Sequence, residues 1–186
     1  MLRFISGLCL AGVLFSAWAE NAPRSAELQA IIQTWQLEKE KKLDDEALVD
    51  QLNRVTALLY QQGQYQPALF IAQLNQQHAA RSLGKEYPDT LTSMNNLAGL
   101  YQAQGRYAKA ESLYQRALKA SERVLGKEHP NTLINVNNLA GLYQAQGRYA
   151  GAEQLYQRAL KAHERVLGRE HPNTLTNVNN LALLYN

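Results

Sequence analysis

Residues 91–132 read LTSMNNLAGLYQAQGRYAKAESLYQRALKASERVLGKEHPNT, and residues 133–174 read LINVNNLAGLYQAQGRYAGAEQLYQRALKAHERVLGREHPNT. These two 42-residue segments differ at only seven positions. Residues 175–186 begin a further copy, and residues 49–90 form a weaker copy whose turn region reads as if one residue had been deleted. Internal repetition at this period predicts a repeat architecture in which each copy is one supersecondary unit.

Each copy contains two apolar stripes at helical spacing, separated by a glycine. In the copy at 91–132 the first stripe consists of Leu91, Met94, Leu97, Ala98 and Tyr101. The second stripe consists of Tyr107, Ala110, Leu113, Tyr114, Ala117, Leu118, Ser121, Val124 and Leu125. Steps of three and four residues place each set on one face of a helix. Each copy is therefore predicted to be a helical hairpin, and copies must stack because one hairpin cannot bury its apolar faces alone.

The predicted helix ends follow from glycine, proline and small polar residues. Gly105 suits a tight turn because glycine tolerates a positive φ. Pro130 is expected to close the second helix, since it cannot continue a ladder of backbone hydrogen bonds. Asn131 or Thr132 is then expected to cap the next helix.

This pattern resembles the tetratricopeptide repeat, in the 42-residue form found in kinesin light chains. The residues that match are Leu97, Ala98 and Tyr101 in the first helix, Ala110, Tyr114 and Ala117 in the second, and the terminal Pro130. The resemblance covers residues 49–186. It implies an all-α fold, a right-handed solenoid of stacked helical hairpins. It also implies a protein-protein interaction module, which binds peptide or protein in a concave groove lined by the first helices.

The N-terminal residues lie outside the repeats and read as a cleaved signal peptide. Arg3 precedes an apolar run at 4–15, and Ala17-Trp18-Ala19 has the small-x-small pattern of a cleavage site. We expect export to the periplasm or the exterior of a bacterial cell, with no membrane attachment after cleavage.

The predicted organisation follows from these segments. It comprises a signal peptide at 1–19, a capping helix and linker at 20–48, a degenerate repeat at 49–90, full repeats at 91–132 and 133–174, and the first helix of a further repeat at 175–186. A membrane-surface or partner-binding role for the helix in 20–48 is the alternative to capping.

Paired asparagines recur on the first helices and are the candidate groove residues. The predicted partner-binding groove consists of Asn95, Asn96, Gln102, Asn137, Asn138, Gln144, Asn179 and Asn180. An amide side chain both donates and accepts, so it can pair with a peptide backbone whatever the peptide's side chains are. The alternative is that one Asn of each pair bonds to the adjacent hairpin. Gly99 and Gly141 either leave room for a ligand backbone or permit close helix packing.

The sequence predicts neither catalysis nor a cofactor. Cys9 is the single cysteine and lies within the predicted signal peptide, so the mature chain has no thiol. His129 and His171 are one repeat apart, too far to share a metal ion. No nucleophile elbow, phosphate loop or paired-carboxylate motif occurs.

Charge does not favour nucleic acid as a partner. The net charge is +3, from 19 Lys and Arg against 16 Asp and Glu, and the two signs are interspersed. The recurring arginines are expected on solvated faces, in intrahelical pairs with glutamate.

The last segment predicts an uncovered apolar stripe, made of Leu175, Val178, Leu181, Ala182 and Tyr185. Truncation of a longer reading frame is the preferred interpretation, and self-association through this helix is the alternative. Two other functions remain open: an N-terminal portion of a larger enzyme with a caspase-like (CHAT) domain, and a self-assembling structural repeat.

Overall fold

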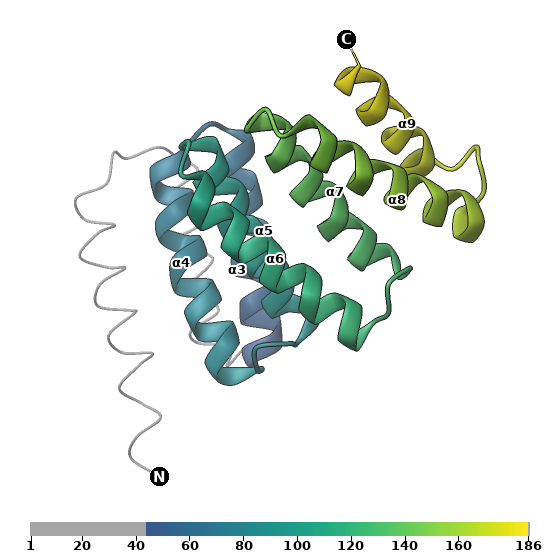
Figure 1. Cartoon of the computed structure of the whole chain (residues 1–186). Coiled ribbons are helices and arrows are strands. Elements are labelled where there is room, and N and C mark those ends of the chain that lie inside the picture. The colour runs from purple at the N-terminus through teal and green to yellow at the C-terminus, as the bar shows by residue number, and fades with distance from the viewer. Residues whose placement is uncertain (1–43, 186) are drawn as a thin grey trace, which may run out of the picture. The chain divides into compact units, whose positions relative to one another are not determined.

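The computed structural model describes residues 44–185, and residues 49 onward form one compact unit. Within the described part there are helices and no strands (Figure 1). The helices are α3 (Asp45–Gln61), α4 (Tyr65–Ser82), α5 (Pro88–Ala103), α6 (Tyr107–Val124), α7 (Pro130–Ala145), α8 (Tyr149–Leu167) and α9 (Pro172–Leu184). The predicted signal peptide and most of the predicted capping segment lie outside the described residues.

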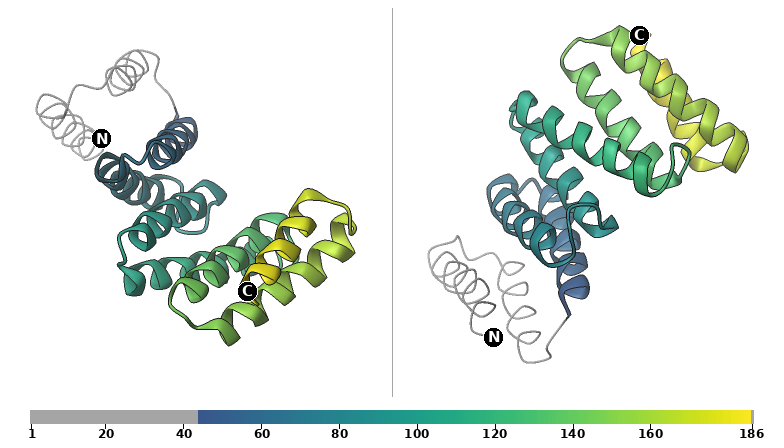
Figure 2. Two further views of the ribbon diagram at one scale, coloured as in Figure 1. Left: turned by 90° about the horizontal axis from the view of Figure 1, so that it is seen from above. Right: turned by 60° about the horizontal axis from the view of Figure 1, so that its bottom comes forward.

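Helices from α4 to α9 each pack against the next one along the chain, and α5 also contacts α7. The two further views in Figure 2 show α5 to α8 as successive helical hairpins, with α9 beside α8. This arrangement confirms the all-helical repeat fold predicted from the period.

The first predicted stripe forms the buried side of α5. Leu91, Met94, Leu97, Ala98 and Tyr101 are all buried. In the second stripe Ala110, Tyr114 and Ala117 are buried, but Val124 is 48% exposed because α6 ends there. The alanines at these contacts have no exposed surface, which allows neighbouring helices to approach closely.

Along α9 most of the predicted stripe is open to solvent. Leu175, Val178, Ala182 and Tyr185 are exposed, and Leu181 is half-buried against α7 and α8. The Tyr185 hydroxyl donates to Glu153 Oε1 at 2.5 Å. The equivalent residues of α5 and α7 are covered by α6 and α8, which explains the contrast.

The degenerate repeat keeps the 42-residue spacing, so the predicted deletion is wrong. At the end of α3 the Gln64 N–H donates to the Leu59 carbonyl, as the Arg106 N–H donates to the Tyr101 carbonyl after α5. Gly63 and Gly105 hold the same positive φ in these two turns. Leu59 therefore corresponds to Tyr101, because moving α3 by one residue would rotate its apolar stripe away from the core.

Helix starts also differ from the prediction, because proline begins the next helix instead of ending the previous one. Pro130 is the first residue of α7, and His129 is its cap. The imidazole Nδ1 of His129 accepts from the Asn131 N–H at 3.2 Å, and His171 does the same for Asn173 at the start of α9. Proline suits the first helical position because its missing N–H would have no partner there. Asn131 and Thr132 are not the cap.

Arginines join successive hairpins, so the predicted intrahelical pairing is wrong for them. Arg148 Nη1 donates to both carboxylate oxygens of Glu111 at 2.9 Å. Arg158 pairs with Glu122 at 2.6 Å. Two further pairs follow the same pattern, Arg123 with Glu86 and Arg165 with Glu128. Exposed pairs of this kind contribute only about 0–1 kcal/mol each to stability.

The Glu111 carboxylate accepts several hydrogen bonds, and Arg148 contacts both of its oxygens. Partial burial alone would raise its pKa, but the hydrogen bonds and charge of Arg148 outweigh burial and hold the pKa below its usual range. The guanidinium also lies over the Tyr143 ring, 3.7 Å from its centroid. One arginine therefore links α6, α7 and the turn that precedes α8.

Buried polar pairs connect α6 to α7 and α8 to α9. Asn135 Nδ2 donates to Ser121 Oγ at 2.6 Å, between α7 and α6. One repeat later Asn177 Nδ2 lies 2.6 Å from His163 Nδ1, between α9 and α8. All four side chains are buried. Two of the seven differences between the repeats, Ser93/Asn135 and Ser121/His163, thus fall at this one type of contact.

Candidate functional site

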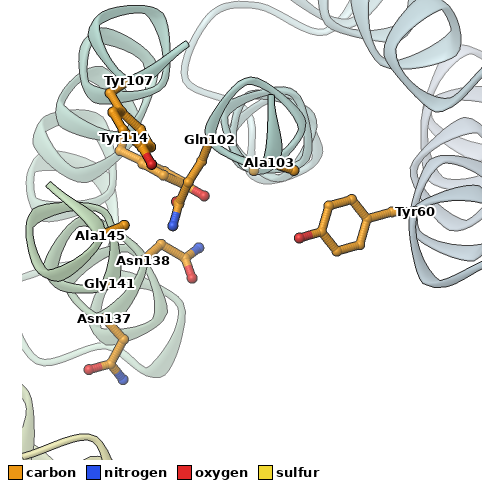
Figure 3. Close-up of a pocket in the computed structure, with 10 residues that line it drawn as sticks. Tyr60, Gln102, Ala103, Tyr107, Tyr114, Asn137, Asn138, Gly141 and Ala145 are labelled. Atoms are coloured by element: carbon orange, nitrogen blue, oxygen red, sulfur yellow. The ribbon is translucent and has the colours of Figure 1, made fainter. Parts of the chain in front are cut away.

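A hollow of about 420 Å³ lies between the first helices of three successive hairpins. We call it the central hollow, and Figure 3 shows the side chains around it. Its lining residues are Tyr60 from α3, Gly99, Gln102 and Ala103 from α5, Tyr107 and Tyr114 from α6, and Asn137, Asn138, Gly141 and Ala145 from α7. Hollows of roughly 300–1,000 Å³ are typical of ligand sites.

Two amide side chains of the central hollow have unused hydrogen-bonding capacity. In Figure 3 Gln102 and Asn138 come from different helices and point toward the same space. Neither side chain bonds to another residue in the described part of the chain, and both are half-buried. Asn137 lies at the margin, and its Oδ1 is buried with no partner among residues 44–185. The two inward amides can therefore pair with a peptide backbone.

The first asparagine pair instead serves the packing between hairpins. Asn96 Nδ2 donates to Asn53 Oδ1 at 3.2 Å, toward α3. Asn95 Nδ2 donates to Asn135 Oδ1 at 2.5 Å, toward α7. Neither residue lines the central hollow. The sequence left open that one asparagine of each pair bonds to the adjacent hairpin, and in this pair both of them do.

The remaining predicted groove residues lie outside the central hollow. Gln144 Oε1 accepts a hydrogen bond from the Tyr156 hydroxyl at 3.1 Å. On α9, Asn179 is exposed and Asn180 is half-buried. The structure therefore brings Gln102, Asn137 and Asn138 together from the predicted set.

Sequence reasoning missed the aromatic side of the site. Tyr60 is 42% exposed and faces Ala103 across the central hollow in Figure 3. Its ring meets Tyr65 edge to face, with centroids 5.5 Å apart. With the unbroken 42-residue spacing Tyr60 stands where the next repeats have Gln102 and Gln144. With the assumed deletion Tyr60 aligned with Tyr101, so its replacement of a glutamine at this position could not be recognised.

Gly99 and Gly141 lie beside tyrosine hydroxyls and on the wall of the central hollow. A Cβ at Gly99 would lie 3.4 Å from Tyr114 Oη, and one at Gly141 would lie 3.5 Å from Tyr156 Oη. Both distances are ordinary contacts, so a methyl group fits here, and it would fill space on the wall of the hollow. Burial raises the pKa of Tyr114, with Tyr60 adding to the effect, so this phenol stays protonated.

Within residues 44–185 there is no group of three His, Cys, Asp or Glu side chains that could hold a metal ion. A search of the same residues finds no helix long and apolar enough to span a membrane. A second hollow of about 540 Å³ lies near α8. Its lining includes Lys127, Glu128, Arg158, Lys161 and Arg165, and both arginines already pair with glutamates.

Comparisons with known proteins agree with the repeat architecture. The family model described as "Tetratricopeptide repeat" matches residues 90–131 and 136–173. No curated protein sequence matches the chain. BtubC (BKLC) from P. vanneervenii has a similar fold, with a TM-score of 0.70 and 21% identity over 86% of this chain and 68% of that one.

Nearly identical TPR-like repeats from Podosopora anserina, assigned to a kinesin light chain, are also similar. Their crystal structure has a TM-score of 0.67 and 25% identity, over 99% of this chain and 88% of that one. A variant of the same protein gives a TM-score of 0.69 and 24% identity, over 100% and 88%. The similarity thus extends over most of both chains.

Proposed function

We propose that this chain, a tetratricopeptide repeat protein with repeats like those of kinesin light chains, is a non-catalytic module that binds a segment of another protein in the central hollow. Tetratricopeptide repeat proteins are generally scaffolds that bind proteins. The observation that carries the proposal is the pair of inward amides, Gln102 and Asn138, on adjacent first helices. Half-buried amides without a protein partner gain hydrogen bonds when an extended backbone passes between them.

The proposal is tested with a random peptide library displayed on phage and selected on the purified protein. For the selected peptide, the double variant Gln102→Ala and Asn138→Ala is expected to bind about tenfold more weakly, since it loses roughly 1.4 kcal/mol of hydrogen bonding. Isothermal titration calorimetry measures the change.

The matched control removes the same two amide types outside the central hollow. Gln77→Ala with Asn131→Ala should leave affinity unchanged, because both side chains are exposed and neither lines the hollow. Equal affinities for the two double variants, or no selected peptide at all, would contradict the proposed function.

Export is part of the proposal and is supported by the N-terminal sequence alone. Arg3, the apolar run at 4–15 and Ala17-Trp18-Ala19 have the order of a signal peptide. When the full chain is expressed in a bacterium, we expect the mature protein to begin at Glu20 and to be recovered from the periplasm or the medium. Mass spectrometry of the intact protein measures this, and a cytoplasmic product that retains residues 1–19 would refute it.

A further inference from the structure

We propose that the central hollow selects an uncharged, extended peptide segment whose single aromatic side chain lies against Tyr60. This inference rests on the proposed function and adds the chemical class of the ligand. Three observations carry it: the lining has no charged residue, a partly exposed aromatic ring stands at one end, and two amides without a partner among the described residues stand at the other.

Charge is the first observation. The ten lining residues are tyrosine, glycine, alanine, glutamine and asparagine. Nearby cations are occupied outside the hollow: Arg106 lies over the Tyr101 ring, 4.5 Å from its centroid, and Arg148 is bound to Glu111. A charged ligand side chain in the hollow would lose water and gain no counter-charge. An uncharged segment avoids that cost.

The aromatic end is the second observation. Tyr60 on α3 is partly exposed, and its ring contacts the Tyr65 ring edge to face. Ala103 faces it across the hollow, so the opposite wall is small and apolar (Figure 3). A flat side chain can pack between this ring and the small wall, and aromatic pairs gain from offset or edge contacts.

The amide end is the third observation. Gln102 on α5 and Asn138 on α7 point into the same space and have no partner among the described residues. Amides read the peptide backbone and are indifferent to side-chain identity. An extended backbone leaves its N–H and C=O groups free to pair with these amides, whereas a helix pairs them internally, so the amides favour an extended ligand.

Short synthetic peptides with capped termini and an uncharged fluorescent label test the inference by fluorescence anisotropy. The probe has one central tryptophan flanked by serine and glycine; its relatives replace tryptophan by alanine, or flanking serines by aspartate or lysine. We expect the uncharged tryptophan peptide to bind the full chain about tenfold more tightly than each relative. Its affinity should be the same at low and high salt, because no charges attract it.

The informative variant is Tyr60→Gln, which installs the residue found at the same position in the next two repeats. Glutamine already occupies this place in α5 and α7, so α3 should fold unchanged. The variant should lose the preference for tryptophan over alanine, a change of about tenfold. Tyr149→Ala removes an equally large, 59% exposed tyrosine outside the hollow and should retain the preference.

Tight binding by the aspartate or lysine peptides, or an unchanged tryptophan preference in Tyr60→Gln, would overturn this inference. So would failure of the uncharged tryptophan peptide to bind at all. A charged library peptide that still depends on Gln102 and Asn138 would overturn the ligand class and leave the proposed function standing.

Discussion

Replacing Asn53 by alanine is expected to lower the free energy of unfolding by about 2–4 kcal/mol. Asn53 is buried on α3 and its amide joins three helices. Its Oδ1 accepts from Asn75 Nδ2 at 2.9 Å and from Asn96 Nδ2 at 3.2 Å, and its Nδ2 donates to the Asp89 carbonyl at 3.2 Å. Alanine leaves these groups buried with fewer partners, which costs more than the hydrogen bonds themselves contribute.

The repeat supplies its own control for this substitution. Asn179 stands at the same repeat position as Asn53 but is exposed on α9. Asn179→Ala should change stability by less than about 0.5 kcal/mol, as exposed substitutions usually do. Urea denaturation followed by circular dichroism measures both. Equal losses would show that the repeat position matters and that the network around Asn53 does not.

Acidification is expected to destabilise the α8–α9 contact through His163. This imidazole is 1% exposed, and its Nε2 has no partner among residues 44–185. Burial lowers its pKa below the ordinary value, and the charge of nearby His171 lowers it further. The folded protein therefore holds a neutral imidazole at a pH where the unfolded chain already binds a proton.

The direction of the pH dependence follows from that difference. Stability is fully present above about pH 6.5, the ordinary histidine pKa, and is lost as the pH falls below it. We expect a loss of at most about 2 kcal/mol between about pH 7.5 and pH 5, because one proton bound only by the unfolded chain costs about 1.4 kcal/mol for each pH unit below its pKa. Urea midpoints at the two pH values give the measurement.

His163→Ser is the matched variant, because the preceding repeat already pairs Ser121 with Asn135 at this contact. The serine variant should be less sensitive to acid than the parent while remaining folded at neutral pH. An undiminished acid loss in His163→Ser would place the responsible proton elsewhere.

The repeat period made most of the fold predictable from the sequence. Leu91, Met94 and Leu97 recur at helical spacing, and a helix with one apolar face has few other ways to bury it. The turns were predictable for a similar reason: Gly105 adopts the positive φ that its position requires. These features depend on local physics that each copy repeats.

The candidate site was less predictable because it depends on contacts between copies. A repeated Asn95-Asn96 pair does not reveal which neighbouring helix each amide meets, and both turned out to bond across hairpins. The role of Tyr60 was hidden by placing a deletion within α3. A one-residue deletion there would rotate the preceding part of the helix by about 100 degrees relative to its turn. Comparison of the sequences alone does not take that rotation into account.

The buried contact between hairpins has a genetic consequence. If codons 133–174 were lost in frame, Asn177 would take the place of Asn135 and would meet Ser121, a pairing the molecule already contains. Asn95, which now donates to Asn135, would donate to Asn177 instead, because Asn177 would then stand at the position of Asn135. Loss or duplication of residues 133–174 by recombination can therefore shorten or lengthen the array and keep side-chain pairings that the molecule already contains. The number of hairpins, and with it the length of surface offered to a ligand, is a trait that such exchanges can alter in single steps.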